Sequence, residues 1–180
     1  NTAIGRQALM SNTSGASNQA IGYQSMYTNT TGINNNAQGY GTLKYNTTGA
    51  NNVAVGHNAS NTNTTGFDNI AIGSLALLLN TTGQYNVALG KSALQANTTG
   101  QQNTAVGKSA LSLNTTANFN TAVGYNALNS TTGPNNTALG YKAGYGTTTH
   151  SNNVFIGHSS GEARLSGNNV SKSSKKEIGQ

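Results

Sequence analysis

The sequence predicts an all-β protein, a parallel β-solenoid of ten coils, each roughly 17 residues long. Glycine recurs at one constant interval from Gly5 to Gly124, an interval that is shortened once before Gly140 and restored at Gly157. An asparagine opens every repeat. Only 34% of the residues are hydrophobic and 7% are charged, too few apolar residues for a conventional thick core. Stability therefore has to come from the stacking of identical repeats.

The repeat array covers residues 1–169, and residues 170–180 are expected to form a basic polar tail or linker. Positions within a coil are numbered from its first asparagine. Position 3 is Ala in nine coils, position 4 is Ile, Val or Leu in nine, and position 5 is always Gly. Positions 12–15 mostly read Asn-Thr-Thr-Gly. The ten coils begin at Asn1, Asn18, Asn35, Asn52, Asn69, Asn86, Asn103, Asn120, Asn136 and Asn153.

Each coil is expected to contain two short strands separated by turns. The first covers positions 2–4 and ends at the invariant glycine, because glycine adopts a positive-φ corner at little cost. The second covers positions 7–10, and positions 12–15 form the other turn, with the asparagine in a left-handed conformation. A helix fits poorly, since a glycine in each repeat costs a helix about 1 kcal/mol.

Small and large apolar residues are neighbours at positions 3 and 4, and again at positions 8 and 9. Neighbouring side chains of a strand point to opposite faces, so one member of each pair fills the lumen and the other lies outside. The outer residues then form a continuous apolar stripe, which three rods packed as a homotrimer would bury. The alternative is a flattened solenoid that shares both positions between its lumen and a bent corner.

Two positions are expected to stack as structural ladders. The position-1 amides can hydrogen-bond along the stack, as in other in-register β arrays, and the position-5 glycines form a corner. The asparagine ladder contains Asn18, Asn35, Asn52, Asn69, Asn86, Asn103 and Asn120. The glycine ladder contains Gly22, Gly39, Gly56, Gly73, Gly90, Gly107 and Gly124.

The units NTAIG, NVAVG, NTAVG and NTALG, followed by a Thr-Gly turn, resemble the head repeats of YadA-like trimeric autotransporter adhesins. They are also similar to the repeats of tail fiber domain-containing proteins, as in residues 136–162. The resemblance implies a left-handed parallel β-roll, intertwined or packed as a homotrimer, in an extracellular fibre on a cell surface or a virion. The chain begins in phase at Asn1 and its pattern stops before VSKSSKKEIGQ, so we expect a piece of a longer protein.

Position 6 is expected to be an exposed ladder of aromatic and cationic side chains. Tyr and Arg are enriched at binding hot spots, so this ladder is a candidate binding surface for a host-surface glycan or protein. The alternative is a solvated corner that tolerates large residues. The candidate binding residues are Tyr23, Tyr40, His57, Lys91, Lys108, Tyr125, Tyr141 and His158, and Arg6 and Ser74 complete the position.

The composition argues against several classes of function. With no cysteine and three acidic residues, we expect no catalytic residues, no enzymatic activity and no cofactor. The three histidines, His57, His150 and His158, are too far apart along the array for a metal site. The basic residues of the array are too dispersed for nucleic acid. No apolar run approaches the length of a transmembrane helix, so we expect no direct membrane insertion.

We therefore expect a structural and adhesive segment of an extracellular trimeric fibre, either a bacterial surface adhesin or a phage tail fibre, that attaches multivalently. One alternative is an ice-binding β-solenoid, because threonine pairs recur at the coil spacing. Another is a structural filament subunit that polymerises end to end through its open coil edges. The Asn-x-Thr runs at position 12 are also N-glycosylation sequons, unless these asparagines serve only as turn residues.

Overall fold

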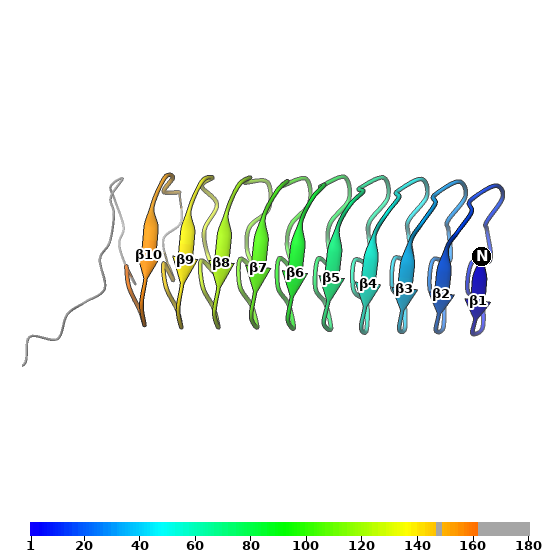
Figure 1. Cartoon of the computed structure of the whole chain (residues 1–180), viewed down its shortest axis with the longest axis horizontal. Helices are drawn as coiled ribbons and strands as arrows, with labels where there is room; N and C mark the ends of the chain where they lie inside the picture. The colour runs from blue at the N-terminus through cyan, green and yellow to red at the C-terminus, as the bar shows by residue number, and fades with distance from the viewer. Residues whose placement is uncertain (147–148, 162–180) are drawn as a thin grey trace, which may run out of the picture.

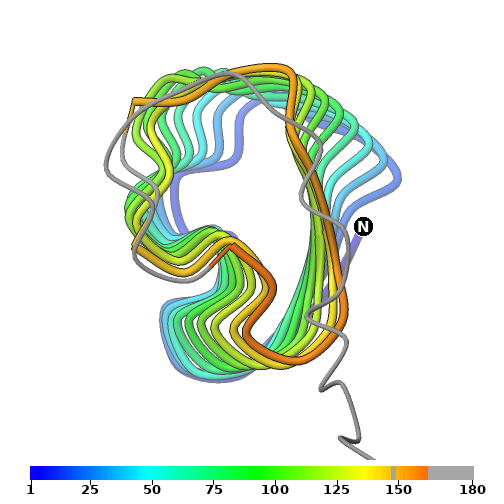
Figure 2. The same cartoon turned by 90° about the vertical axis from the view of Figure 1, so that its left-hand side faces the viewer.

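The computed structural model describes residues 1–146 and 149–161, which form one ten-stranded parallel sheet with each strand next to its sequence neighbour. Figure 1 shows the strands side by side along a rod, and Figure 2, viewed along the rod, shows the coils stacked on one another. The all-β solenoid prediction is confirmed. The strands are β1 (Thr2–Ile4), β2 (Gln19–Ile21), β3 (Asn36–Gln38), β4 (Val53–Val55), β5 (Ile70–Ile72), β6 (Val87–Leu89), β7 (Thr104–Val106), β8 (Thr121–Val123), β9 (Thr137–Leu139) and β10 (Val154–Ile156).

The predicted residues of the array beyond 161 and the predicted tail over 170–180 lie outside the described residues. Within residues 1–146 and 149–161, no helix is long and apolar enough to cross a membrane.

The sheet keeps equivalent residues in register from coil to coil. Ala54 pairs with Ala71, one repeat further along the chain, and the other pairs of strands follow the same rule. The shortened coil does not disturb this register, since Thr121 of β8 still pairs with its equivalent, Thr137 of β9. The missing residue is therefore accommodated outside the strands.

The lumen is filled by small residues at positions 3 and 8 and by larger ones at position 9. The position-3 alanines of β2 to β9 are fully buried, as are Ala76 and Leu77 at positions 8 and 9 of one coil. The predicted second strand over positions 7–10 is therefore wrong, and so is the expectation that one residue of this pair lies outside. Leu75 and Leu77 have φ values of 62° and 49°, so left-handed residues on both sides of Ala76 break the alternation of a strand.

The position-1 asparagines form a continuous hydrogen-bonded ladder. The backbone N–H of Asn52 donates to Oδ1 of Asn35 (3.0 Å), and the Asn52 amide donates to the carbonyl of Gly66 in its own coil (2.9 Å). The neighbouring coils repeat this arrangement, for example between Asn69 and Asn52 (3.1 Å). Because these side chains are buried, each ladder bond replaces a bond to water and also fixes the register between coils.

A second asparagine ladder runs along position 12, in the Asn-Thr-Thr-Gly turn. Asn80 is fully buried, and its amide donates to Oδ1 of Asn63 (2.8 Å) and to the carbonyl of Gly83 (3.1 Å). These asparagines are not left-handed, so that part of the turn prediction is wrong. The left-handed residues outside glycine lie at positions 7, 9 and 17, as Ser92, Leu94 and Gln102 show in one coil, and in the shortened coil the last of them is Asn135 at position 16.

The position-5 glycines make the corner that follows each strand. Gly90 has a φ of +130°, and a β-carbon added there would lie 2.7 Å from the carbonyl carbon of Gly107 in the next coil. Two independent constraints, the backbone conformation and the contact between coils, thus exclude any larger residue at this corner.

The shortened coil ends the position-12 ladder and leaves one side-chain amide of the position-1 ladder without a partner, although the backbone bonds of the position-1 ladder continue through it, from Asn120 to Asn103 and from Asn136 to Asn120. Residue 131 is a threonine where earlier coils have the position-12 asparagine, and the buried Oδ1 of Asn114 has no hydrogen-bond partner. The buried Nδ2 of Asn120, in the shortened coil itself, also has none. These two unpaired atoms lie on either side of the junction between the shortened coil and the preceding one, and they mark that junction as a weak point in the rod, since an unpaired buried polar group costs about 1–3 kcal/mol.

Candidate functional site

The outer face of the sheet consists of the side chains at positions 2 and 4 of the ten strands. The position-3 alanine between them points inward, so both flanking side chains point outward, as the partly exposed Ile70 and Ile72 of β5 do. Sequence reasoning expected the position-4 stripe but missed position 2 as its partner, although the period of two along a strand would have identified it.

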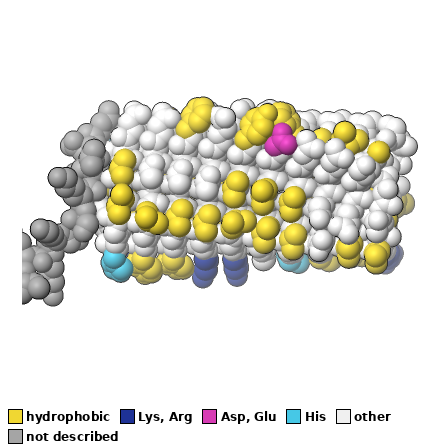
Figure 3. Space-filling model, in the orientation of Figure 1, with side chains coloured by type: hydrophobic (Ala, Val, Ile, Leu, Met, Phe, Trp, Pro, Cys, Tyr) yellow, Lys and Arg dark blue, Asp and Glu magenta, His cyan; other side chains and the backbone are white. Residues whose placement is uncertain are grey.

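This outer face is most apolar in the middle of the rod. Strands β4, β5 and β6 carry aliphatic residues at both positions, and Figure 3 shows their side chains as adjoining rows. Strand β3 is polar instead, with the Gln38 amide donating to Oδ1 of Asn36 (3.1 Å). The predicted stripe is therefore interrupted at Gln38 by a pair of polar side chains that bond to each other on the same face.

Position 6 forms an edge beside this face, and its first four residues make one continuous stack. The Arg6 guanidinium carbon lies 6.0 Å from the ring centre of Tyr23. Tyr23 stacks on Tyr40 and Tyr40 on His57, each pair with ring centres 5.2 Å apart. The in-register coils place these rings one above another, so the spacing of the coils itself brings the rings into stacking distance.

The last four residues of position 6 repeat the same order of side chains six coils further along. Lys108 Nζ lies 5.6 Å from the ring centre of Tyr125, which stacks on Tyr141 at 5.3 Å. Tyr141 stacks in turn on His158 at 4.8 Å. Ser74 and Lys91 separate the two stacks. The order cation, tyrosine, tyrosine, histidine thus occurs twice, a pattern that the sequence already contains but that position-by-position reading did not reveal.

Positive charge gathers at this edge. Among the described residues, four of the five Lys and Arg side chains lie at positions 6 and 7, and the fifth, Lys44, lies at position 10. Lys142 at position 7 lies 5.6 Å from the Tyr141 ring centre and 5.2 Å from that of Tyr145. Figure 3 shows the cations and histidines along one edge, and the one described carboxylate, Asp68, along the other.

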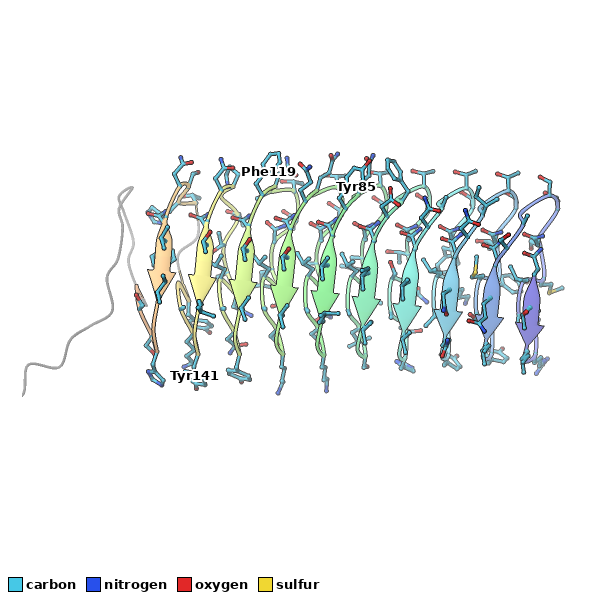
Figure 4. All side chains as sticks on the ribbon, viewed as in Figure 1. Tyr85, Phe119 and Tyr141 are labelled. Atoms are coloured by element: carbon cyan, nitrogen blue, oxygen red, sulfur yellow. The ribbon has the colours of Figure 1, made fainter. Side chains whose placement is uncertain are left out.

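The opposite edge carries a second group of aromatic residues that sequence reasoning did not single out. Phe67 and Tyr85 meet edge to face, with ring centres 5.3 Å apart, and Tyr85 and Phe119 are about half exposed. Figure 4 shows Tyr85 and Phe119 at one edge of the rod and Tyr141 at the other. These residues lie at positions 16 and 17, where the aromatic side chains are too few and too scattered for a sequence pattern.

The threonine turn offers one free row of hydroxyls rather than two. The position-13 hydroxyls are engaged, since Thr64 Oγ1 donates to the carbonyl of Thr81 (3.0 Å) and Thr81 Oγ1 to that of Thr98 (3.1 Å). The position-14 threonines, such as Thr65 and Thr82, are exposed.

The sequon asparagines of position 12 are not accessible in the folded coil. Asn29, Asn46, Asn63, Asn80, Asn97 and Asn114 are fully buried and their amide groups donate to neighbouring coils and turns. A glycan on any of these nitrogens would replace ladder hydrogen bonds inside the rod. The structure therefore favours their role as turn and ladder residues.

The described residues offer geometry for surface contacts but not for an enclosed site. Residues 1–146 and 149–161 contain no pocket and no cluster of three or more metal-ligating side chains. The three sites with exposed chemistry are therefore extended ones: the outer face, the position-6 edge and the opposite aromatic edge. Comparison with known proteins gave no match, neither to a family model, nor to a curated protein, nor to a solved structure.

Proposed function

We propose that this chain is a structural and adhesive segment of an extracellular trimeric fibre, of the kind found in bacterial surface adhesins or phage tail fibres. One observation carries the proposal: nine of the ten strands place an aliphatic side chain at position 4 of the outer face, and β4, β5, β6 and β10 add one at position 2, and a single rod leaves this apolar surface partly exposed. Three rods that turn this face inward bury it along their whole length. The resemblance of the NTAIG-type units to adhesin and tail-fibre repeats supports the same assembly, its handedness and its extracellular place.

The position-6 edge suits the adhesive part of this role. It lies beside the outer face rather than on it, so it stays accessible when the outer face is buried (Figure 3). Its residues recur at the coil spacing of about 4.8 Å, so a rod of ten coils displays them over roughly 43 Å. Repeated weak contacts along three such edges reach high avidity without any tight single site.

An ice-binding solenoid is the alternative that the threonine turn suggests. Ice binding needs a flat, regular array of hydroxyls, whereas here only position 14 is free because the position-13 hydroxyls donate to backbone carbonyls. An end-to-end filament is the other alternative, and it leaves the apolar outer face unexplained. The trimeric fibre accounts for that face and is therefore our conclusion.

Sedimentation equilibrium at two concentrations tests the assembly. We expect a mass three times the chain mass of 18.4 kDa. Ile72→Asp places a charge in the middle of the outer face and should reduce the mass to that of a single chain, because a buried unpaired charge is costly. A monomeric wild-type chain would overturn the trimer, and thermal hysteresis of that monomer would establish the ice-binding alternative.

Leu79→Asp is the matched control for this experiment. Leu79 lies in the same coil as Ile72 and is equally exposed, at 44% against 43%, but it lies outside the sheet. We expect the Leu79 variant to remain trimeric. Equal effects of the two substitutions would show that the outer face is not the interface.

A further inference from the structure

We propose that the position-6 edge binds a linear acidic polysaccharide, one that carries carboxylate or sulfate groups, aligned with the axis of the rod. This inference rests on the adhesive role proposed above and names the class of ligand for it. Three observations carry it: the closed faces of the stacked tyrosine rings, the cations that begin the two stacks, and the position of the one described carboxylate.

The faces of the tyrosine rings are closed by their neighbours in the stack. Tyr40 lies between Tyr23 and His57, with ring centres 5.2 Å away on each side and interplanar angles of 20° and 13°. Tyr141 lies in the same way between Tyr125 and His158. A ligand therefore reaches the ring edges and the phenol hydroxyls, not the ring faces.

Closed faces exclude two common ways of using aromatic residues for binding. Single-stranded nucleic acids gain affinity by stacking their bases on free aromatic faces. Neutral sugars commonly stack on such faces too. Neither contact can form on Tyr40 or Tyr141 without breaking the stack, so the edge is suited to hydrogen bonds and to charge, which a hydroxylated polyanion supplies together.

The cations of this edge lie at the start of each stack, and two of them lie side by side in the middle of the rod. Arg6 and Lys108 begin the two stacks, and Lys91 lies one coil before Lys108. Asp68, the one acidic residue in the described part of the chain, lies at position 17, at the opposite edge of the rod (Figure 3). Lys91 and Lys108 lie in successive coils, closer than the Debye length of about 10 Å at 0.1 M salt, so these two cations act together on a polyanion.

The test measures binding of the full chain, in its native assembly, to four immobilised polymers. Heparin and polygalacturonate represent sulfated and carboxylated polysaccharides, dextran a neutral one, and single-stranded poly(dT) a nucleic acid. We expect binding to at least one of the acidic polysaccharides that weakens by about tenfold or more between 50 and 200 mM salt. We expect at least tenfold weaker binding to dextran and to poly(dT).

Charge and hydroxyl variants locate the contact. Lys108→Gln should weaken binding about threefold or more and reduce its salt dependence, because it removes one cation from the ladder. Lys44→Gln is the matched control, since it removes one cation at position 10, and it should leave binding within about twofold. The double substitution Tyr40→Phe and Tyr141→Phe keeps the stacks but removes two hydroxyls, and it should also weaken binding.

Several outcomes would overturn the inference: no binding to either acidic polysaccharide, equal binding to poly(dT) or to dextran, or equal effects of Lys44→Gln and Lys108→Gln. These failures are separable from a failure of the fibre proposal. A chain that sediments as a trimer but binds none of the polymers would support the fibre proposal and overturn this ligand class. A monomer whose binding to polygalacturonate depends on Lys108 would support the ligand class and overturn the trimer.

Discussion

The ring of Phe155 in β10 fills the lumen beside Gly144, where a β-carbon added to the glycine would lie 2.7 Å from Phe155 Cδ2. Phe155 replaces the alanine of position 3, and Gly144 replaces the large residue that most other coils have at position 9. Gly161, at position 9 of the last described coil, also contacts this ring closely enough to leave no room for a side chain. The end of the lumen is thus filled from the sheet instead of from the opposite wall.

This exchange predicts a strong coupling between residues 144 and 155. Phe155→Ala alone should lower the free energy of unfolding by about 3–5 kcal/mol, because it empties the end of the lumen. Gly144→Leu alone should cost about 1–3 kcal/mol through overpacking against the ring. The double variant restores the pattern of the earlier coils, in which a leucine such as Leu128 lies buried at position 9. It should therefore be more stable than the Phe155 variant.

Urea denaturation of the two single variants and the double variant measures this coupling. The interaction free energy of the double-mutant cycle should be at least about 1 kcal/mol in the stabilising direction. Additive effects of the two substitutions would show that Phe155 does not occupy the space of the missing position-9 side chain.

The position-12 ladder predicts a stability that depends on pH once a carboxyl group is introduced into it. In Asn80→Asp, the donor to Asn63 Oδ1 and to the Gly83 carbonyl is replaced by an acceptor in a fully buried site. Burial and the facing carbonyl oxygens raise the pKa of the introduced carboxyl in the folded state. The folded variant therefore binds more protons than the unfolded one, and it gains stability as the pH falls from 7 towards about 4.

Thermal unfolding at several pH values checks this expectation. At pH 7 the Asn80 variant should be at least about 3 kcal/mol less stable than the wild type, and the deficit should shrink on acidification. Asn51→Asp is the control, because Asn51 is exposed and its Oδ1 already acts as an acceptor for Asn34 (3.2 Å). A deficit of the Asn80 variant that does not change with pH would contradict the buried ladder.

The part of the fold that follows from strand periodicity could be predicted from the sequence, and the part set by left-handed residues could not. Positions 2–4 alternate between lumen and surface, which located all ten strands, for example β5 (Ile70–Ile72). Positions 7–10 resemble a strand in composition, but the φ of 49° at Leu77 turns its side chain into the lumen next to Ala76. Adjacent small and large apolar residues occur at positions 3 and 4 as well, where a strand does form, so composition did not separate the two segments.

The candidate binding residues were identifiable from the repeat, but their interactions were not. Counting from the glycine corner found the position-6 side chains from Tyr23 to His158 without knowledge of the fold. That Tyr40 stacks on both neighbours follows only from the three-dimensional register of the coils. The apolar partner of the position-4 stripe, exemplified by Ile70, could have been identified from the strand period of two, and the buried Ala71 between Ile70 and Ile72 shows that both flanking side chains point outward.

The glycine corner predicts that even the smallest substitution is costly. Gly90→Ala combines an unfavourable φ of +130° with a β-carbon 2.7 Å from the backbone of Gly107, so strand and corner have to shift. We expect a loss of more than about 2 kcal/mol in the free energy of unfolding, measured by urea denaturation. Lys91→Ala, at the next residue, changes an exposed side chain and should stay within about 0.5 kcal/mol. A Gly90 variant of wild-type stability would refute the close packing of the corners.

Because position 17 is left-handed, a glycine at this position should stabilise the fold, whereas a glycine at the neighbouring position 16 should destabilise it. Gln102 is exposed with a φ of 55°, and glycine adopts this conformation without the clash of a β-carbon. Gln102→Gly should therefore raise the free energy of unfolding by about 0.5 kcal/mol, after the greater flexibility of the unfolded chain is subtracted. Gln101→Gly, at an exposed residue without a positive φ, should lower it by about 0.5–1 kcal/mol. Parallel urea titrations measure both, and a destabilised Gln102 variant would contradict the left-handed geometry that holds each turn against the next.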